Sequence, residues 1–427
     1  MASVTTPAQL DGLFKQIYAD NIVNLIPDSA RLVKDIKFVG ADKETGDQYN
    51  QPVVLSNEHG VSFGAAGDGA FSLNSAIALS MKNASIQGSM QVLRSAISYD
   101  AASKASSSKK AFVRGTEFLI ENMLESMTKS QEISLLYGGS GIGSASAVTG
   151  TTTSTETDRV ITLSTASFAA GIWSGAENSI INFYTAGGAL VSSSADANFT
   201  VAAVDIGART IKLTHTAAGG QALKTAITSA AVNIFRQGSY GKEMTGLNEI
   251  SSNTTGTIFG ISATTFGAWA GNVHSAGSGA LTMAKVLAGL AKAAQRGLNE
   301  DVTLYTNPAT WANLNADQAA LRSYDSSYKS SNADVGQQSI TYYGQTGKID
   351  IISHSLVKEG EAFAVPLARC RRIGSSDITF KRPGRQGEDF FRELPDSAGY
   401  ELRSYQDISL FCSSPNKLVK FSSIVNS

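Results

Sequence analysis

"AFVRGTEFLIENMLESMTKSQEISLL", Ala111–Leu136, is the stretch that decides the fold. Its apolar residues recur at steps of three and four, which is typical of an amphipathic helix. Such a helix would be about 40 Å long, well beyond the usual length of about 11 to 12 residues. We therefore expect a structural spine. Its apolar face would comprise Phe112, Leu119, Ile120, Met123, Leu124 and Met127, and its charged face Glu117, Glu121, Glu125 and Lys129.

A glycine-rich stretch, "LLYGGSGIGS" (Leu135–Ser144), follows the predicted helix. A dinucleotide-binding loop has the pattern Gly-x-Gly-x-x-Gly between a strand and the start of a helix, where phosphate meets helix N-terminal amides. Here Ser144 stands in place of the third glycine, and the loop follows the end of a helix, where the dipole has the wrong sign. We predict a flexible linker that leaves the spine, and no cofactor site.

The residues before the spine predict an arm and a long hairpin. Pro7–Leu25 has helical apolar spacing and Pro27 ends it, so we expect a short amphipathic arm helix. Residues 35–54 are extended in character. In Ser56–Leu79, two extended flanks surround the glycine-rich centre Gly64–Gly69, which predicts a hairpin with a flexible tip.

The residues after the spine change in character twice. Val148–Arg236 is rich in Thr and Ser and alternates with period two, so we expect an inserted all-β module, a barrel or a sandwich. Leu281–Gly297 predicts a helix ended by glycine. "DVTLYTNPATWANLN", residues 301–315, predicts a strand, a turn and a helix start, and further strands follow. The fold class is α+β.

Composition limits the partners that the chain can attract. Charged residues make up 17% of the chain and the net charge is −1, so no overall field draws it to nucleic acid or to an anionic membrane. We find no signal peptide and no apolar run near the roughly 20 residues of a membrane span. Cys370 and Cys412 are the two cysteines; they fall in predicted strands, where free thiols are expected and a disulfide stays possible.

No arrangement of residues predicts catalysis or metal binding. The four histidines, His59, His215, His274 and His354, are far apart and lack a second ligand at metal-site spacing. His59 and His354 are expected to be ordinary polar residues. Ser-x-x-Lys recurs along the chain, for example at Ser106/Lys109, Ser126/Lys129 and Ser326/Lys329, as chance allows in a Ser-rich chain, and without the other acyl-transfer motifs.

One segment is unusually charged. "KRPGRQGEDFFRE", Lys381–Glu393, holds seven charged residues of both signs in thirteen. It predicts either a solvated loop between strands or an inter-subunit contact in which opposite charges fix the orientation of a symmetry mate.

The order of these parts resembles a known family. An arm, a long hairpin, a spine ending in "LLYGG", a segment with "VTLYTNPATWANL" and a C-terminal series "GYELRSYQDISLFCSSPNKLVKFSSI" follow one another. This layout resembles the major capsid protein of tailed bacteriophages, the Hong Kong 97-type coat fold that encapsulins and herpesvirus capsids share.

The resemblance implies a division of the chain. It would comprise an N-terminal arm and first strands (1–50), an E-loop hairpin (51–95), a peripheral domain with the spine (96–147), an inserted all-β domain (148–236), an axial domain (237–370) and C-terminal peripheral strands (371–427).

The resemblance also implies a function: pentamers and hexamers that form an icosahedral shell around phage DNA in the virion, made in the host cytoplasm. Implied partners are other copies of the chain, a separate scaffolding protein, a portal, a decoration protein and non-specifically bound DNA, with no membrane and no enzymatic activity. The alternatives are an encapsulin-like shell, or another virion structural protein or adhesin. Candidate inter-subunit contacts are Phe63 and Phe71 beside the hairpin tip, with Arg382, Arg385, Glu388, Asp389, Arg392 and Glu393.

Overall fold

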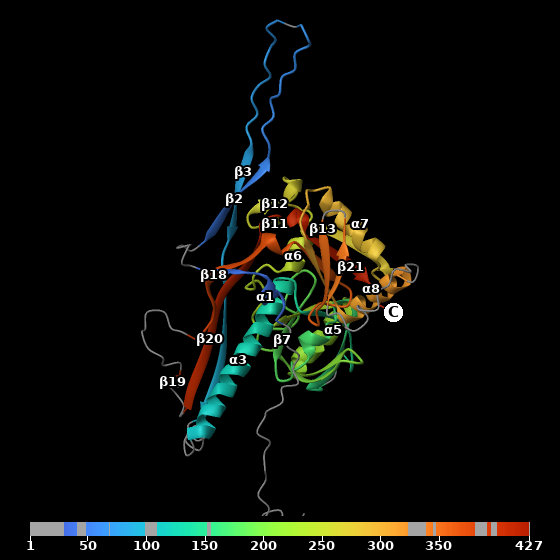
Figure 1. The fold of residues 1–427 in the computed structure, drawn as a ribbon. Helices are drawn as coiled ribbons and strands as arrows, with labels where there is room; N and C mark the ends of the chain where they lie inside the picture. The colour runs from blue at the N-terminus through green and yellow to red at the C-terminus, as the bar shows by residue number, and fades with distance from the viewer. Residues whose placement is uncertain are drawn as a thin grey trace, which may run out of the picture.

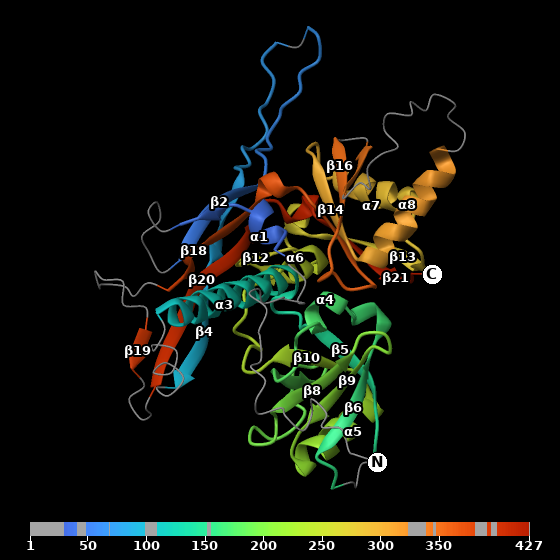
Figure 2. The same ribbon diagram turned by 60° about the horizontal axis from the view of Figure 1, so that its bottom comes forward.

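The structure is a computed structural model, and it describes residues 30–40, 48–67, 69–98, 109–151, 155–322, 339–344, 347–380, 391–393 and 399–426. The predicted arm helix, Pro7–Leu25, lies outside these residues. Figure 1 shows an elongated molecule from which one hairpin projects, and Figure 2 shows a separate small barrel below the rest of the fold.

The spine helix is confirmed as α3 (Lys109–Tyr137), which lies along a five-stranded sheet (Figure 2). The sheet follows the order β1 (Phe38–Val39), β18 (Cys370–Thr379), β20 (Gly399–Cys412) and β19 (Phe391–Glu393), and β4 (Ser89–Ser98) also pairs with β20. Strands from both ends of the chain therefore share one sheet, and a single long helix covers it.

Of the predicted apolar face of α3, the structure describes the burial of Ile120, Met123, Leu124 and Met127, and Leu124 departs from the prediction. Met123 and Met127 are buried, whereas 37% of Leu124 is exposed. Leu124 lies about 100° around the helix from Met123, off the buried stripe. The last two turns are buried on all sides, polar residues included, because other parts of the chain surround them.

The predicted hairpin is formed by β2 (Tyr49–Ser56) and β3 (Ser80–Ile86), which pair antiparallel. Residues 57–79 extend beyond them (Figure 1), and His59 and Ile77 form one further antiparallel bridge. Residues 89–95, which we grouped with the hairpin, lie instead in β4 of the large sheet.

A second sheet has six strands, in the order β13 (Asn272–Gly279), β21 (Val419–Ile424), β17 (Ala362–Val365), β14 (Val302–Thr306), β16 (Lys348–Ser353) and β15 (Ser339–Tyr343). Both predicted elements are present here: helix α7 (Met283–Ala294), and β14 followed by α8 (Pro308–Arg322). The Thr282 hydroxyl caps α7 by accepting the Lys285 N–H. The two helices cover one face of the sheet and share a core with it.

Six strands close into a barrel, in the order β10 (Val232–Arg236), β5 (Gly143–Val148), β6 (Asp158–Leu163), β9 (Thr210–Thr214), β8 (Phe199–Asp205) and β7 (Ile180–Tyr184). Its first strand starts at Gly143, before the expected Val148. The module is not all-β, because α5 (Ala217–Ser229) lies within it. We did not predict this helix, because Gly219 and Gly220 weaken the helical pattern of the sequence. The Thr216 side chain caps its N-terminus. A Cβ at Gly220 would collide with the His215 ring.

The glycine-rich stretch after α3 is a packed turn and not a flexible linker. Gly139 and Gly141 have positive φ values of 81° and 79°, which glycine adopts without strain. A Cβ at Gly138 would lie 2.2 Å from the Met244 carbonyl oxygen, so only glycine allows the two backbones to approach. The turn carries the chain from α3 directly into β5.

The remaining elements connect these parts. They are α1 (Leu32–Asp35), α4 (Ala170–Trp173), α6 (Leu247–Ser252), β11 (Thr257–Ile258) and β12 (Ile261–Ser262). One continuous core joins the barrel, the end of α3 and one face of the six-stranded sheet. No helix in the part of the chain that the structure describes is long and apolar enough to span a membrane.

Candidate subunit interface

The hairpin exposes apolar side chains that its own subunit does not cover. Phe63 is 87% exposed and Leu73 is 80% exposed. A hairpin that projects from its domain cannot bury such side chains against itself, and exposed apolar patches of this kind mark interaction sites. The exposed apolar residues of the hairpin are Val54, Val61, Phe63, Phe71, Leu73, Ile77, Leu79 and Met81; we call this set the hairpin patch.

The two phenylalanines singled out from the sequence have different surroundings. Phe71 packs across the hairpin on Gly64, where any Cβ would lie 2.8 Å from its ring. It is 46% exposed, about half as much as Phe63. Phe71 therefore shapes the hairpin, whereas Phe63 offers nearly its whole ring to a partner.

The base of the hairpin is held firmly. The ring of Tyr49 in β2 meets that of Phe411 in β20 edge to face, with centroids 6.0 Å apart. The Ser85 N–H donates to the Phe259 carbonyl at 2.9 Å. Ala84 and Ile86 are buried in a small core with Trp269 and Phe411. The hairpin that carries the patch is therefore anchored at its base to the body of the subunit.

A charged strip runs across β4 and β20. Arg94 Nε donates to Glu401 Oε2 at 2.5 Å, and Arg403 pairs with the other oxygen of Glu401. Burial disfavours the charged carboxylate, but the two arginines outweigh it and lower the pKa of Glu401. Beside this strip, Met90 and Val92 on β4 are exposed. The strip places an ion-pair network next to an apolar surface.

The charged segment 381–393 is described only at its end. Arg382, Arg385, Glu388 and Asp389 lie outside the described residues. Phe391–Glu393 forms β19, where Arg392 lies opposite Glu401 of β20 and its guanidinium is 5.7 Å from the centre of the Tyr405 ring. The inter-subunit role of this segment stays a prediction.

A buried polar cluster that the sequence did not reveal fixes the start of the described chain. Glu132 on α3 is fully buried, and its oxygens accept the backbone N–H groups of Arg31, Leu32 and Val33 at 2.6 to 3.0 Å. His354 Nε2 lies 2.8 Å from Glu132 Oε1. From the sequence we expected His354 to be an ordinary polar residue and did not single out Glu132, because nothing local in a sequence links positions 222 apart.

The same region is fixed from two further sides. The Tyr305 hydroxyl donates to Asp35 at 2.6 Å, and burial is the main reason that the pKa of Tyr305 is raised. Arg372 on β18 donates to the carbonyls of Ile36 and Val33. The direction in which the chain enters α1 is therefore fixed by α3 and by both sheets.

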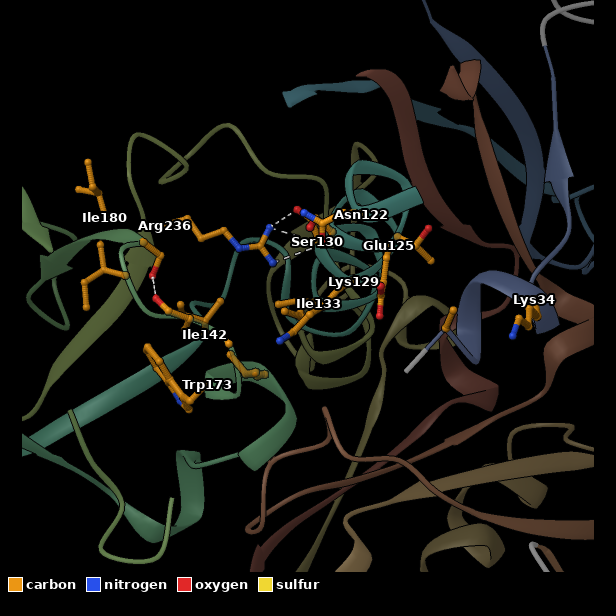
Figure 3. Close-up of a pocket in the computed structure, with 18 residues that line it drawn as sticks. Lys34, Asn122, Glu125, Lys129, Ser130, Ile133, Ile142, Trp173, Ile180 and Arg236 are labelled. Atoms are coloured by element: carbon orange, nitrogen blue, oxygen red, sulfur yellow. Dashed lines mark hydrogen bonds between the residues drawn. The ribbon is translucent and has the colours of Figure 1, made fainter. Parts of the chain in front are cut away.

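A cavity of about 660 Å³ lies where α3 meets the barrel (Figure 3). Arg236 of β10 reaches Ser130 of α3, with Nη1 2.6 Å from the Ser130 hydroxyl. Lys129 Nζ donates to the Ser174 carbonyl of the barrel module at 2.5 Å. Burial lowers the pKa of both cations, and the Arg236 charge lowers that of Lys129 further. The cavity therefore lies at the interface between the barrel and α3, and these contacts hold the two together.

The residues considered for metal binding do not form such a site. Among the described residues, no three His, Cys, Asp or Glu side chains lie close enough to hold a metal ion. Cys370 and Cys412 face each other across β18 and β20 and are buried, free thiols. The Cys412 thiol and burial raise the pKa of Cys370 well above its usual range.

Comparisons with known proteins find similarity among solved structures. No protein-family model and no curated protein sequence matches the chain. The capsid of cyanophage A-1(L) aligns with 98% of this chain and 99% of its own, at 13% identity and a TM-score of 0.58. A capsid chain of a native GTA particle (8% identity, 99% and 100% covered, TM-score 0.49) and the SrpI encapsulin of Synechococcus elongatus (10%, 99% and 96%, 0.43) are also similar.

The assignment of the fold rests on the cyanophage structure alone, because the other two TM-scores are below 0.5. The alignment covers nearly the whole of both chains, so the likeness is one of overall fold. The chain has the Hong Kong 97-type fold of phage capsid proteins.

Proposed function

We propose that this chain is a major capsid protein, which assembles into pentamers and hexamers that close an icosahedral shell around phage DNA. The observation that carries the proposal is the hairpin patch, a row of exposed apolar side chains on a rigid projecting hairpin, within a fold shared over its full length with a cyanophage capsid chain. A second copy of the chain is the partner that this geometry suits.

The parts of the fold take corresponding roles in the proposal. The β2–β3 hairpin is the E-loop, α3 with the five-stranded sheet is the peripheral domain, and the six-stranded sheet with α7 and α8 is the axial domain. The barrel, residues 143–236, is an insertion into this plan. It stiffens subunit contacts or decorates the outer surface.

The proposed interface combines apolar burial with paired charges. Burying apolar surface stabilises by about 25 cal/mol per Å², so Phe63 and Leu73 would supply the main attraction. Arg392 and Glu393, with Arg382, Arg385, Glu388 and Asp389, would fix the orientation of neighbouring capsomers through opposite charges. A net charge of −1 lets many copies pack without strong mutual repulsion.

Other partners follow from the same proposal. A separate scaffolding protein and a portal would guide closure, and a decoration protein would bind the finished shell. Contact with packaged DNA would be weak and independent of sequence. The subunit would be made in the host cytoplasm and function in the virion, without catalysing a reaction.

The test is assembly of the purified chain, alone and co-expressed with the scaffolding protein of its phage. We expect uniform round particles, or rings of five and six, by negative-stain electron microscopy and a matching fast sedimenting species. A chain that stays monomeric or trimeric with scaffolding present would overturn the proposal. Nuclease-protected DNA in particles from infected cells supports a viral coat, whereas enclosed protein cargo supports the encapsulin alternative.

A further inference from the structure

Two thiols face each other where the chain passes between the two large sheets. Cys370 is the first residue of β18 and Cys412 is the last residue of β20, and the antiparallel register places them directly opposite each other. They are 3% and 0% exposed. The chain has no other cysteine, so each thiol has one possible partner within the subunit. We call these two residues the thiol pair.

The hydrogen bonds around the thiol pair show which kind of antiparallel pair it is. The Ser413 N–H donates to the Arg369 carbonyl at 3.0 Å, so Arg369 and Ser413 are a hydrogen-bonded pair. Hydrogen-bonded and non-hydrogen-bonded pairs alternate along an antiparallel ladder, so the thiol pair, one step further in, is non-hydrogen-bonded. The Arg372 N–H donates away from β20, to the carbonyl of the residue before β1, which gives the same alternation two residues further on.

A non-hydrogen-bonded pair has the geometry that a disulfide needs. Its Cα atoms lie about 4.5 Å apart, and its side chains are closer together than those of a hydrogen-bonded pair. A disulfide joins Cα atoms that are about 4.4 to 6.8 Å apart. The Cys412 thiol is a hydrogen-bonding neighbour of Cys370, and it is the first cause of the raised pKa of Cys370. The two sulfurs can therefore bond without a change in the register of the strands.

We propose that Cys370 and Cys412 are a modification site, at which hydrogen peroxide converts two free thiols into a cross-strand disulfide. Residues 366–369 connect β17 to β18, and residues 413–418 connect β20 to β21. The disulfide would therefore clamp together two connections between the six-stranded and the five-stranded sheet. The proposal is independent of shell formation, because both thiols belong to one subunit.

The atoms and electrons balance with hydrogen peroxide as the oxidant. The sulfur of one thiol attacks a peroxide oxygen, the O–O bond breaks, and the departing hydroxide takes the thiol proton to form water. This leaves a sulfenic acid. The sulfur of the second thiol attacks the sulfenic sulfur, the S–S bond forms as the S–O bond breaks, and the departing hydroxide leaves with the second thiol proton as water. Two thiols are oxidised and one peroxide is reduced to two waters.

The position of the thiol pair gives a small oxidant access to it. One residue pair, Arg369 and Ser413, lies between it and the end of this ladder, and Arg369 is exposed. Elements open locally more easily at their ends than within a packed core. The thiolate is the reactive form, and the Cys412 thiol and burial raise the pKa of Cys370. We therefore expect slow oxidation, and a pair that stays reduced in a reducing compartment.

Mass spectrometry of the reduced, folded subunit tests the proposal after exposure to hydrogen peroxide. Catalase removes the peroxide before the chain is denatured with N-ethylmaleimide, so that any link formed in the folded state. The oxidised wild-type chain should take up no maleimide, and the reduced chain should take up two. Trypsin should release a peptide in which residues 370–371 are joined to residues 404–417, lighter by two hydrogen atoms than the two reduced peptides together.

Two kinds of variant serve as controls. Cys370→Ser and Cys412→Ser should each form no linked peptide. Methionine oxidation adds oxygen to wild type and variants alike, so the linked peptide is the deciding signal. Peroxide should also raise the thermal midpoint of the wild-type chain by a few degrees, because a cross-link restricts the unfolded chain. The rise should reverse with a reductant and be absent from the double variant Cys370→Ser/Cys412→Ser.

Three outcomes would overturn the proposal. The first is a wild-type chain that still takes up two maleimides after the peroxide treatment. The second is oxygen added to Cys370 or Cys412 without a linked peptide. The third is a link between two chains, visible as a dimer in a non-reducing gel. The wild-type result decides the question even if a variant fails to fold.

Discussion

At the scale of single residues, Glu132 shows how one carboxylate positions a segment distant in sequence. It is fully buried on α3 and accepts three consecutive backbone N–H groups from residues 31–33, and its Oε1 also contacts His354. The Leu356 N–H donates to His354 Nδ1 at 3.2 Å, so His354 carries its hydrogen on Nε2 and donates it to Glu132. The start of α1 thus depends on one negative charge.

We predict that Glu132→Gln weakens this anchor, because an amide accepts hydrogen bonds less strongly than a carboxylate and brings a donor to an acceptor site. The expected loss is about 2 to 3 kcal/mol of stability, with faster amide hydrogen exchange at Arg31–Val33. Glu121→Gln, on the exposed side of the same helix, should change neither quantity. Unchanged exchange at residues 31–33 in Glu132→Gln would refute the anchoring role.

Lys358 predicts a specific dependence of stability on pH. Burial lowers its pKa to about 8 in the folded chain, against an ordinary 10.5 when unfolded. Below pH 8 both states bind the proton and the cost of a buried charge is present in full. Between pH 8 and 10 the folded state loses the proton while the unfolded state keeps it, so stability rises with pH.

Relative to Lys358→Met, the wild-type chain should therefore gain about 2 to 3 kcal/mol of stability from pH 8 to 10. The difference in thermal midpoint between the two proteins, measured by calorimetry across this window, checks the sign. Lys292→Met, at an exposed lysine of α7, should show no such gain. A difference in thermal midpoint between wild type and Lys358→Met that does not change with pH would contradict the lowered pKa of Lys358.

At the scale of elements, the helices and strands that have a clear local spacing of apolar residues could be predicted from the sequence. The spine, the hairpin, helix α7 and the β14–α8 turn all follow from the spacing of apolar residues and from glycine or proline. Helix α5 was not predicted, because Gly219 and Gly220 weaken the helical pattern. A glycine is needed at position 220, because any Cβ there would collide with the His215 ring. The cluster at Glu132 could not be predicted, because its partner His354 lies 222 residues away.

The hairpin provides the prediction at this scale. Phe63→Asp should leave the melting temperature of the isolated subunit unchanged, because the ring is 87% exposed there. It should reduce the fraction of subunits in particles at least tenfold, roughly the effect of losing one interface hot spot. Ile206→Asp changes an exposed isoleucine at the β8–β9 turn and serves as the matched control.

Sedimentation of the three proteins with scaffolding present measures that fraction. Normal particle yield from Phe63→Asp would remove Phe63 from the interface. An equal loss from Ile206→Asp would show that any added surface charge disturbs assembly, and the hairpin patch would lose its special role.

At the scale of the whole molecule, a tightly packed body carries a projecting hairpin. Both sheets, α3 and the barrel share continuous cores, and the joint between barrel and spine is held by Arg236 and Lys129. Among the described residues, the hairpin is the part that extends away from this body (Figure 1). Such an arrangement makes sense if a neighbouring copy supplies the surface that the hairpin patch requires.

The most direct test of this account is a cryo-electron microscopy reconstruction of assembled particles in which each hairpin can be traced. The account predicts a closed shell with Phe63 and Leu73 packed against the adjacent subunit. A shell in which the hairpin patch stays in solvent would contradict the interface proposed for it, and the absence of any closed shell with scaffolding present would contradict the capsid function itself.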